Sequence, residues 1–414
     1  MKRLYLGFIF SLFSLVYAQS PSAYDFLSSL LNIDLNAGLN RMLITRIPSG
    51  GLAEGMGMAY TAVSTDSSFL EFNPSASCIQ DFTELSLYHN NWIADSRLES
   101  VIFTKRLDHI GFALGGKWLY LPFSEYNDYG DRLSSGYYSE ALLIGNASLH
   151  LFPGYYFYGI AIGANIKLAY QSFPDFADAN DIVQAGSGFD QSALALMADF
   201  GMLTKFNFLK YYASRSKNMS VGLALKNFGP PIQGDPLPTT FTFGLAYSPI
   251  RPLTLSSDIS FPINLVDISK SEQEYWSVGM NFIFTDFFSI HSGLQVKGAN
   301  PRLTVGTAID FNPMTLFVNY TLDLTTQLSS LNHLSIQARF RLGDMGRAER
   351  ANKVDELYVL GLERYTRGDI ERAIIFWSEA LALDPGFDPV RDALRIAKNS
   401  LEMREEMKGL LNLE

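Results

Sequence analysis

The side chains able to support catalysis or bind a metal are few and scattered along this 414-residue chain. The histidines stand singly, without the H-x-x-x-H or Cys/His spacing of a metal site; they are His89, His109, His150, His291 and His333. Cys78 is the lone cysteine, and Ser67 lacks the G-x-S-x-G context of a hydrolase nucleophile. We therefore expect no enzymatic activity, no metal site and no cofactor.

Lysines and arginines form a second group with possible chemistry, because a cation in an enclosed site can bind a carboxylate. The chain contains segments in which polar and apolar residues alternate, and one set of positions in each segment would face an enclosed interior. Several lysines and arginines occupy such inward-facing positions. The candidate ligand-binding residues are Lys117, Lys167, Lys226, Arg302 and Arg339, and Lys297 and Arg341 share their phase. Any water-filled interior would also carry such residues, and this alternative stays open.

The elements that must position these cations are segments of roughly ten residues in which apolar residues alternate with polar or small ones. A period of two predicts β-strands with two different surroundings. We count fourteen such segments, at residues 82–91, 99–106, 109–118, 137–152, 155–170, 190–203, 218–227, 239–248, 252–262, 274–285, 288–297, 302–311, 314–323 and 332–342. An even number is typical of a bacterial outer-membrane barrel.

The connections between these segments favour the same fold. One alternate set is short, as at Asp286-Phe287 and Asn312-Pro313 with an exception at 204–217, and the other set is mostly longer. Charge is low at 18%, as a lipid-facing surface requires, because a Lys or Arg facing lipid costs about 2–4 kcal/mol. The expected fold class is mainly β, a 14-stranded antiparallel transmembrane β-barrel with an N-terminal luminal plug and a small C-terminal α-helical domain. A soluble β-sandwich is the alternative.

The chain divides into four expected parts. Residues 1–18 resemble a secretory signal peptide, with Lys2 and Arg3 before an apolar run and a small residue at Ala18. Residues 19–81 would form the plug, 82–342 the barrel and 343–414 the helical domain. The last boundary follows the composition, because 26 of the 71 residues from Asp344 onward are charged. The formal net charge of −10 gives no basic surface, so we expect no nucleic-acid partner.

The plug is expected because fourteen strands leave a lumen wide enough to leak unless something fills it. The stretch GGLAEGMGMAYTAVSTDSSFLEFNP, residues 50–74, is apolar and rich in small residues. Small residues allow its backbone to lie close to the barrel wall, and the Asn-Pro pair would turn the chain toward the first strand. The plug motif comprises Gly55, Ala59, Ala62, Asp66, Asn73 and Pro74.

This motif, followed by fourteen candidate strands, resembles the N-terminal signature of the FadL family of outer-membrane long-chain fatty acid transporters and of a spirochaetal branch of that family. Ser75 departs from the usual alanine, and the helical C-terminal extension is absent from the well-known transporters. The resemblance implies an N-terminal hatch and lateral passage of a hydrophobic ligand beside a kinked strand. We place that lateral-gate kink at Gly115 and Gly116, where glycine packing against a neighbouring aromatic is the alternative.

The C-terminal part matches the 34-residue tetratricopeptide pattern. The motif residues are Gly361, Gly368, Ala373, Trp377, Ala380 and Pro385, although Arg364 stands where tyrosine is common. We expect this tetratricopeptide-like (TPR-like) domain to lie in the periplasm and to bind a periplasmic protein. A folded lid under the barrel is the alternative.

These observations together predict an outer-membrane transporter for long-chain fatty acids or similar hydrophobic molecules. The partners would be a fatty-acid-like ligand, outer-membrane lipid and a periplasmic protein. The alternative is a FadL-like barrel that serves as a scaffold or shuttle for a secretion or assembly complex through its helical tail.

Overall fold

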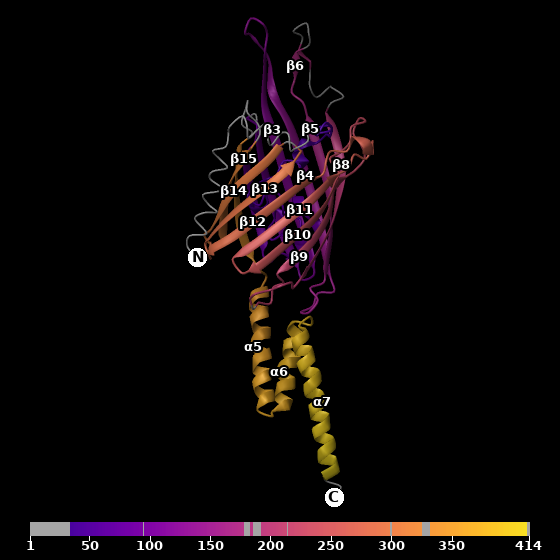
Figure 1. The fold of residues 1–414 in the computed structure, drawn as a ribbon, viewed down its shortest axis with the longest axis vertical. Helices are drawn as coiled ribbons and strands as arrows, with labels where there is room; N and C mark the ends of the chain where they lie inside the picture. The colour runs from indigo at the N-terminus through magenta and orange to yellow at the C-terminus, as the bar shows by residue number, and fades with distance from the viewer. Residues whose placement is uncertain are drawn as a thin grey trace.

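The computed structural model describes residues 34–93, 95–177, 183–184, 192–212, 214–298, 300–324 and 332–411. The expected signal peptide and residues 19–33 of the expected plug lie outside them. Within these ranges, fourteen antiparallel strands close into one barrel, in which β1 (Thr83–Asn91) pairs with β16 (His333–Gly343) (Figure 1). The fourteen-stranded antiparallel barrel predicted from the sequence is therefore confirmed.

The strands between these two follow one another around the wall. They are β2 (Arg97–Leu107), β3 (Ile110–Tyr126), β4 (Arg132–Leu151), β5 (Ile160–Ser172), β8 (Ala193–Phe206), β9 (Met219–Phe228), β10 (Thr240–Ile250), β11 (Leu253–Pro262), β12 (Tyr275–Thr285), β13 (Phe288–Lys297), β14 (Asn300–Asp310) and β15 (Met314–Asp323). A separate pair joins β6 (Phe176–Ala177) to β7 (Val183–Gln184), and a 3₁₀ turn, η4 (Ile268–Lys270), precedes β12.

The largest departures from the expected bounds occur in β3, β4 and β5. The β3–β4 hairpin continues to the pair Tyr126–Arg132, whereas the pairing of β3 with β2 ends at Tyr120 and that of β4 with β5 ends at Ser139. Paired only to each other, the hairpin ends rise beyond the rim of the barrel (Figure 1). Strand β5 begins at Ile160 rather than at residue 155, because residues 152–159 form the turn from β4.

The wall presents an apolar outer face and a largely polar inner face. In β2, Val101 and Phe103 are exposed, whereas Ile102 and Thr104 between and after them are buried. Leu114 and Trp118 of β3 are likewise at least half exposed, at 57% and 50%. A row of large exposed apolar side chains suits hydrocarbon rather than water, which is the arrangement of a transmembrane barrel and not of a soluble sandwich.

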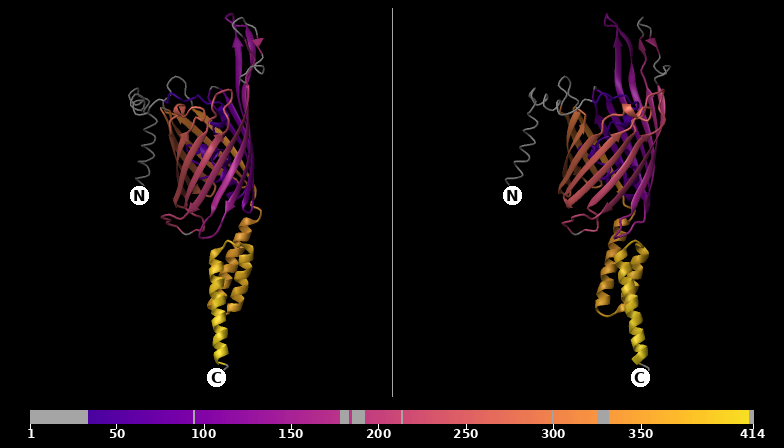
Figure 2. Two further views of the ribbon diagram at one scale, coloured as in Figure 1. Left: turned by 90° about the vertical axis from the view of Figure 1, so that its right-hand side faces the viewer. Right: turned by 45° about the vertical axis from the view of Figure 1, so that its right-hand side comes forward.

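The N-terminal segment comprises residues 34–80, of which residues 42–80 lie inside the ring of strands (Figure 2) and residues 34–41 contact the loops at its upper rim. It contains η1 (Leu43–Thr45), α3 (Gly51–Gly55), α4 (Phe69–Phe72) and η2 (Pro74–Ile79). Its fully buried Phe69 and Leu70 belong to one apolar cluster with the inward-facing Ile102, Leu142 and Met197. The core of the barrel therefore forms between this segment and the inner face of the wall.

Glycines of the wall lie where the backbone of the N-terminal segment approaches most closely. A Cβ atom added at any of five inward positions, Gly111, Gly163, Gly222, Gly279 and Gly293, would lie less than 3 Å from that backbone. These glycines belong to five different strands. These wall glycines, called the glycine track below, leave room for the backbone of the N-terminal segment along one path.

The bulge expected at Gly115 and Gly116 is absent. Both residues pair without a register shift to β2 and to β4, so β3 has no bulge at this point. A Cβ atom at Gly115 would meet the side chain of Leu70, so the glycine makes room for the N-terminal segment rather than for an aromatic neighbour. A register shift of the wall instead lies between Ala198 and Phe200, where β8 pairs with β9.

Three helices, α5 (Arg347–Thr366), α6 (Ile370–Leu383) and α7 (Asp388–Leu411), hang below the barrel (Figures 1 and 2). The Asp388 carboxylate accepts hydrogen bonds from the backbone N–H groups of Tyr155 and Tyr156 at 3.1 and 3.2 Å. Arg215 of the long turn after β8 forms an ion pair with Asp355 of α5. Two turns of the wall therefore hold the helices. Among the described residues, no helix is long and apolar enough to cross a membrane.

The glycine track gives a test of the fit between wall and segment. We expect Gly163→Val to displace residues 73–75, because its side chain would overlap the backbone at Pro74, and overpacking of this kind costs about 1–3 kcal/mol. Limited proteolysis of the purified protein in detergent should then cleave the N-terminal segment faster, while the heat-modifiable shift of the barrel on electrophoresis persists.

Gly145→Val is the matched control, because a Cβ atom at Gly145 meets nothing within 4 Å. Equal protection of the segment in both variants would contradict the close fit.

Candidate functional site

The interior is held together by wall side chains that satisfy the backbone of the N-terminal segment. The Asp258 carboxylate accepts hydrogen bonds from the N–H groups of Tyr60 and Thr61, at 3.0 and 2.9 Å. Amides of three further strands donate to segment carbonyls: Asn165 to Leu70 at 2.9 Å, Asn146 to Pro74 at 2.8 Å and Asn319 to Gly51 at 2.8 Å. An irregular backbone in a closed interior needs such partners, because an unpaired buried polar group costs about 1–3 kcal/mol.

The residues of the predicted plug motif all lie in this interior. Asp66 accepts hydrogen bonds from the Tyr60 hydroxyl and the Ser68 N–H, and the Asn73 amide donates to the carbonyls of Thr61 and Met202. Ala59 and Ala62 are fully buried, Gly55 lies against His291, and the Pro74 carbonyl accepts from Asn146. Most of these residues thus support local turns and close approach to the wall.

Two cavities lie on opposite sides of the N-terminal segment. The lower cavity, at the end nearest the helices, has a volume of about 460 Å³, and Leu52 and Met56 contribute to its lining. The upper cavity, at the opposite end, has a volume of about 430 Å³, and Glu54 and Gly57 contribute to its lining. Helix α3 and the two residues after it therefore form part of the partition between them.

Two cations of the upper cavity lie beside aromatic rings. The Lys226 ammonium lies 5.3 Å from the ring centre of Phe72, and the Arg302 guanidinium lies 5.7 Å from that of Trp92. Both were candidates from the sequence. Cations beside aromatic rings at the edge of a cavity provide a place for an anionic head next to an apolar surface.

Two other candidates, Lys117 and Lys167, contact protein groups and line neither cavity. The Lys117 ammonium lies 2.9 Å from the Glu71 carboxylate and also donates to the Ile47 carbonyl, so it fixes the N-terminal segment. The Lys167 ammonium lies 2.7 Å from Asp199 within the wall. Ligand binding by these two stays an untested prediction, and in this conformation their positions are structural.

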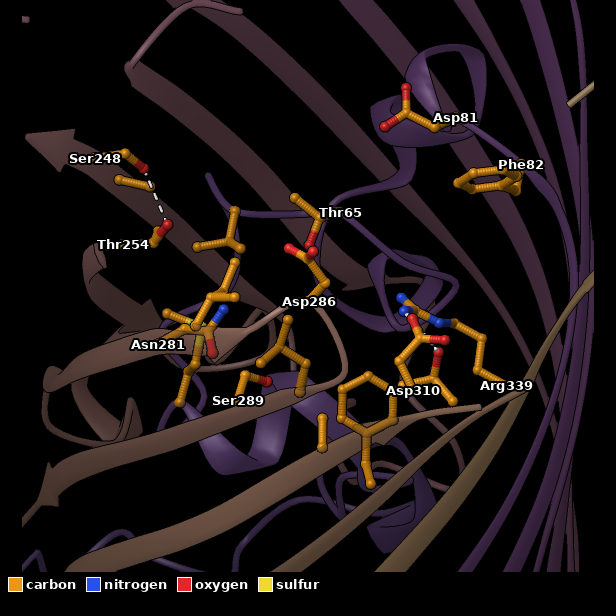
Figure 3. Close-up of a pocket in the computed structure, with 18 of the residues that line it drawn as sticks. Thr65, Asp81, Phe82, Ser248, Thr254, Asn281, Asp286, Ser289, Asp310 and Arg339 are labelled. Carbon is orange, nitrogen blue, oxygen red and sulfur yellow. Dashed lines mark hydrogen bonds between the residues drawn. The ribbon is translucent and has the colours of Figure 1, made fainter. Parts of the chain in front are cut away.

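The fifth candidate, Arg339, lines the lower cavity together with Arg341. Arg339 lies 3.8 Å from the buried Asp66 carboxylate, and Arg341 pairs with Asp310. Figure 3 shows Arg339 and Asp310 on one side of this cavity and Ser248, Thr254 and Asn281 on the other. Both arginines therefore have a carboxylate within 4 Å.

Sequence reasoning missed the acidic partners that hold the segment at the upper end. Glu272, in the loop before β12, contacts the Arg46 guanidinium at 2.6 and 2.7 Å and the Lys297 ammonium at 2.8 Å. Burial of the carboxyl opposes ionisation, but the Arg46 hydrogen bonds and the Lys297 charge outweigh it and lower the pKa of Glu272 from 4.5 to about 2. Nothing in local spacing indicates this pair, because 226 residues separate Arg46 from Glu272.

Glu54 is the acidic group that anchors α3. Its carboxylate accepts a hydrogen bond from Thr321 at 3.0 Å and lies 2.8 Å from His333 Nε2, with both ionisable side chains nearly fully buried. This contact uses one of the histidines that the sequence left without a role. In the part of the chain that the structure describes, no cluster of His, Cys, Asp or Glu could hold a metal ion.

A closed apolar-faced barrel with an occupied interior defines the class of outer-membrane β-barrels with a filled lumen. The fold agrees with that of the Ralstonia pickettii toluene transporter TbuX, at 12% identity and a TM-score of 0.50, covering 71% of this chain and 98% of that one. A Pseudomonas aeruginosa FadL homologue also aligns, at 10% identity and a TM-score of 0.44, covering 70% and 98% of the two chains.

The chain belongs to the Uncharacterised protein family UPF0164, whose model matches residues 35–344. A UPF0164 protein of Treponema pallidum (strain Nichols) is 28% identical over 389 residues, covering 89% of this chain and 85% of the relative. A second UPF0164 protein of the same organism is 21% identical over 388 residues, covering 89% and 77%. The family match covers the N-terminal segment and the barrel and stops where the helices begin.

The contact between Glu272 and Arg46 predicts a loss of stability in acid. A carboxyl whose pKa is lowered by folding stabilises the protein above its unfolded pKa of 4.5, and this contribution disappears as the pH falls toward 2. We expect about 2 kcal/mol to be lost by pH 3. Thermal unfolding of the wild type and of Glu272→Gln, compared at pH 7 and pH 3, measures it.

The variant should be less stable than wild type at pH 7 and should lose less stability on acidification. Glu274→Gln, at an exposed acid two residues away, is the control. An identical pH dependence in wild type and Glu272→Gln would contradict the assignment.

Proposed function

We propose that this protein is an outer-membrane transporter for long-chain fatty acids or similar hydrophobic molecules, which pass through the interior of the barrel. The observation that carries the proposal is the interior itself, with two cavities of about 430 and 460 Å³ on either side of a thin partition. Cavities of this size are large enough for a small ligand. The shared fold with channel proteins supports a transport role over an enzymatic one.

In this proposal the N-terminal segment is a plug that closes the lumen between passages. Its support is the burial of the motif residues and the hydrogen bonds that the wall makes to its backbone. A signal peptide over residues 1–18 would direct the chain to the periplasm for insertion. The parts would then be the signal peptide, the plug to residue 81, the barrel to residue 342 and the helical domain.

The upper cavity is the entry site for the ligand. Lys226 or Arg302 would bind a carboxylate head, and Phe72 or Trp92 beside it would pack against the first methylenes. Each buried methylene contributes about 0.8 kcal/mol, so the apolar surface provides most of the affinity and the cations orient the molecule. A ligand with an uncharged head would therefore lose only the smaller, electrostatic part of the binding free energy.

A second function, docking of a periplasmic protein, is favoured by the helices. Trp377 lies against Gly361, where a Cβ atom would come closer than 3 Å, and Ala373 and Ala380 are fully buried. Gly368 has a φ of +81° in the turn between α5 and α6, and Pro385 lies between α6 and α7. This spacing supports a TPR-like unit in the periplasm, where the barrel would act as a scaffold. A periplasmic partner that still binds after deletion of residues 344–414 would contradict it.

The ligand proposal predicts a charge-selective defect. Lys226→Gln combined with Arg302→Gln should reduce the affinity for palmitate about tenfold, because each charge-assisted hydrogen bond contributes about 1.5–3 kcal/mol, part of which water replaces. Binding of a neutral hydrocarbon of similar length should change little. Mass spectrometry of ligand extracted from the purified protein and equilibrium binding of both probes measure these effects.

Lys270→Gln, at an exposed lysine of the upper rim, is the control. Failure to recover any acyl compound from the wild type, together with no measurable palmitate binding, would overturn the transport proposal.

A further inference from the structure

The outer face of the wall carries charged side chains on two neighbouring strands only. Near the upper end of most strands the outward side chain is large and apolar or aromatic, as at Tyr170, Leu194, Phe228, Phe241, Phe261 and Trp276. Where a described strand is paired on both sides, Lys, Arg, His, Asp or Glu occupies an outward position only on β1 and β2, at His89, Arg97, Glu99 and Lys105. The first three of these residues lie together near the upper end.

Strand pairing places this charged group beside two aromatic rings. Arg97 of β2 is paired with Tyr120 of β3, and Glu99 is paired with Trp118. The ring centres of Trp118 and Tyr120 are 4.6 Å apart. Tryptophan and tyrosine on a lipid-facing wall lie at the level of the lipid headgroups. Arg97 is therefore next to side chains that are typical of the membrane interface.

The height of Arg97 on the wall agrees with this placement. Strand β2 runs for 11 residues from Arg97 to Leu107 at the lower turn, where Leu107 and its partner Ile110 are still exposed apolar residues. At about 3.3 Å per residue and a strand tilt of about 40°, this length spans a height of about 25 Å, which equals the apolar band of an outer-membrane barrel. At the edge of that band an arginine costs about 0–1 kcal/mol, against about 2–4 kcal/mol at the midplane.

The Arg97 guanidinium is exposed and has no hydrogen-bond or ion-pair partner among the described residues. Glu99, the acid on the same face of β2, contacts His89 Nδ1 at 2.8 Å instead. A guanidinium presents a planar fork of N–H donors that matches two oxygens of a phosphate group. The side chain is thus free to bind a phosphate that lies at the level of the headgroups.

We propose that Arg97, with Trp118 and Tyr120 beside it, is a binding site for the phosphodiester of a membrane phospholipid at the upper interface. The occupant is a lipid rather than a free phosphate, because the residues lie on the lipid-facing side of the wall. Below Trp118 on the same face, Gly116 has no side chain, and a Cβ atom there would meet only Val101, at 3.7 Å. An acyl chain can therefore lie close to the wall beneath the bound headgroup. The site is separate from the proposed transport path.

The test uses the full chain in nanodiscs that contain equal amounts of phosphatidylglycerol, phosphatidylcholine and an uncharged galactosyl diacylglycerol with the same acyl chains. Native mass spectrometry identifies the lipids that stay bound as the collision energy rises. In the wild type we expect one phospholipid, with either phosphate-containing head, to remain after the other lipids have left. In Arg97→Gln we expect the retention of phospholipid relative to glycolipid to fall about tenfold, because one charge-assisted contact is lost.

Two further variants make the result specific. Arg97→Lys keeps the charge but not the planar fork, so the preference for phospholipid should fall only about threefold. Lys105→Gln removes the other outward cation of β2, near its lower end, and should leave the strongly retained lipid unchanged. Heat-modifiability shows that each variant is folded. Palmitate binding by Arg97→Gln should equal that of the wild type, because Arg97 faces away from the lumen.

Several outcomes would overturn the lipid site. They are retention of the glycolipid as strong as that of the phospholipids, an unchanged profile in Arg97→Gln, and an equal loss in Lys105→Gln. The absence of any preferentially retained lipid in the wild type would overturn it as well. None of these results bears on the transport proposal, whose ligand lies inside the barrel.

Discussion

The requirement that every buried backbone polar group finds a partner governs this interior. Strand pairing provides hydrogen-bond partners for the backbone of the wall. The N-terminal segment has little regular structure, so its backbone depends on side chains that reach it from the wall. Asp258, Asn146, Asn165 and Asn319 supply these partners from four different strands. Because wall and segment are each incomplete without the other, the barrel and its filling form one cooperative structure.

The strand count and the location of the motif residues followed from the sequence because both depend on local patterns. The alternation of apolar and polar residues determines which side chains of a strand face inward. Small residues such as Ala59 and Ala62 indicate close packing, whichever element they pack against. The track of wall glycines could not be recognised, because a glycine such as Gly163 has the same local signature whether it faces a neighbouring backbone or a bend. The neighbour of Gly115 is Leu70, which lies 45 positions earlier in the chain, and the local sequence does not indicate it.

The candidate cations show the same limit more clearly. Periodicity correctly indicated that all five face inward, but it could not indicate which have acidic partners, because those partners are remote in sequence. Lys117 meets Glu71 from the segment, and Lys167 meets Asp199 from a neighbouring strand. Only the closed barrel distinguishes cations that stabilise the filling from Lys226 and Arg302, which face the upper cavity.

The partition between the cavities is thin where α3 crosses the interior. This helix has five residues, contacts β13 to β16, and is flanked by backbone with positive φ at Gly50 and Gly51 and again at Gly57 and Met58. The later η2 contacts β2 to β5 and β8 across the opposite wall. Helix α3 and its Glu54 anchor therefore lie at the boundary between the two cavities, against β13 to β16, while η2 attaches the rest of the segment to the opposite wall.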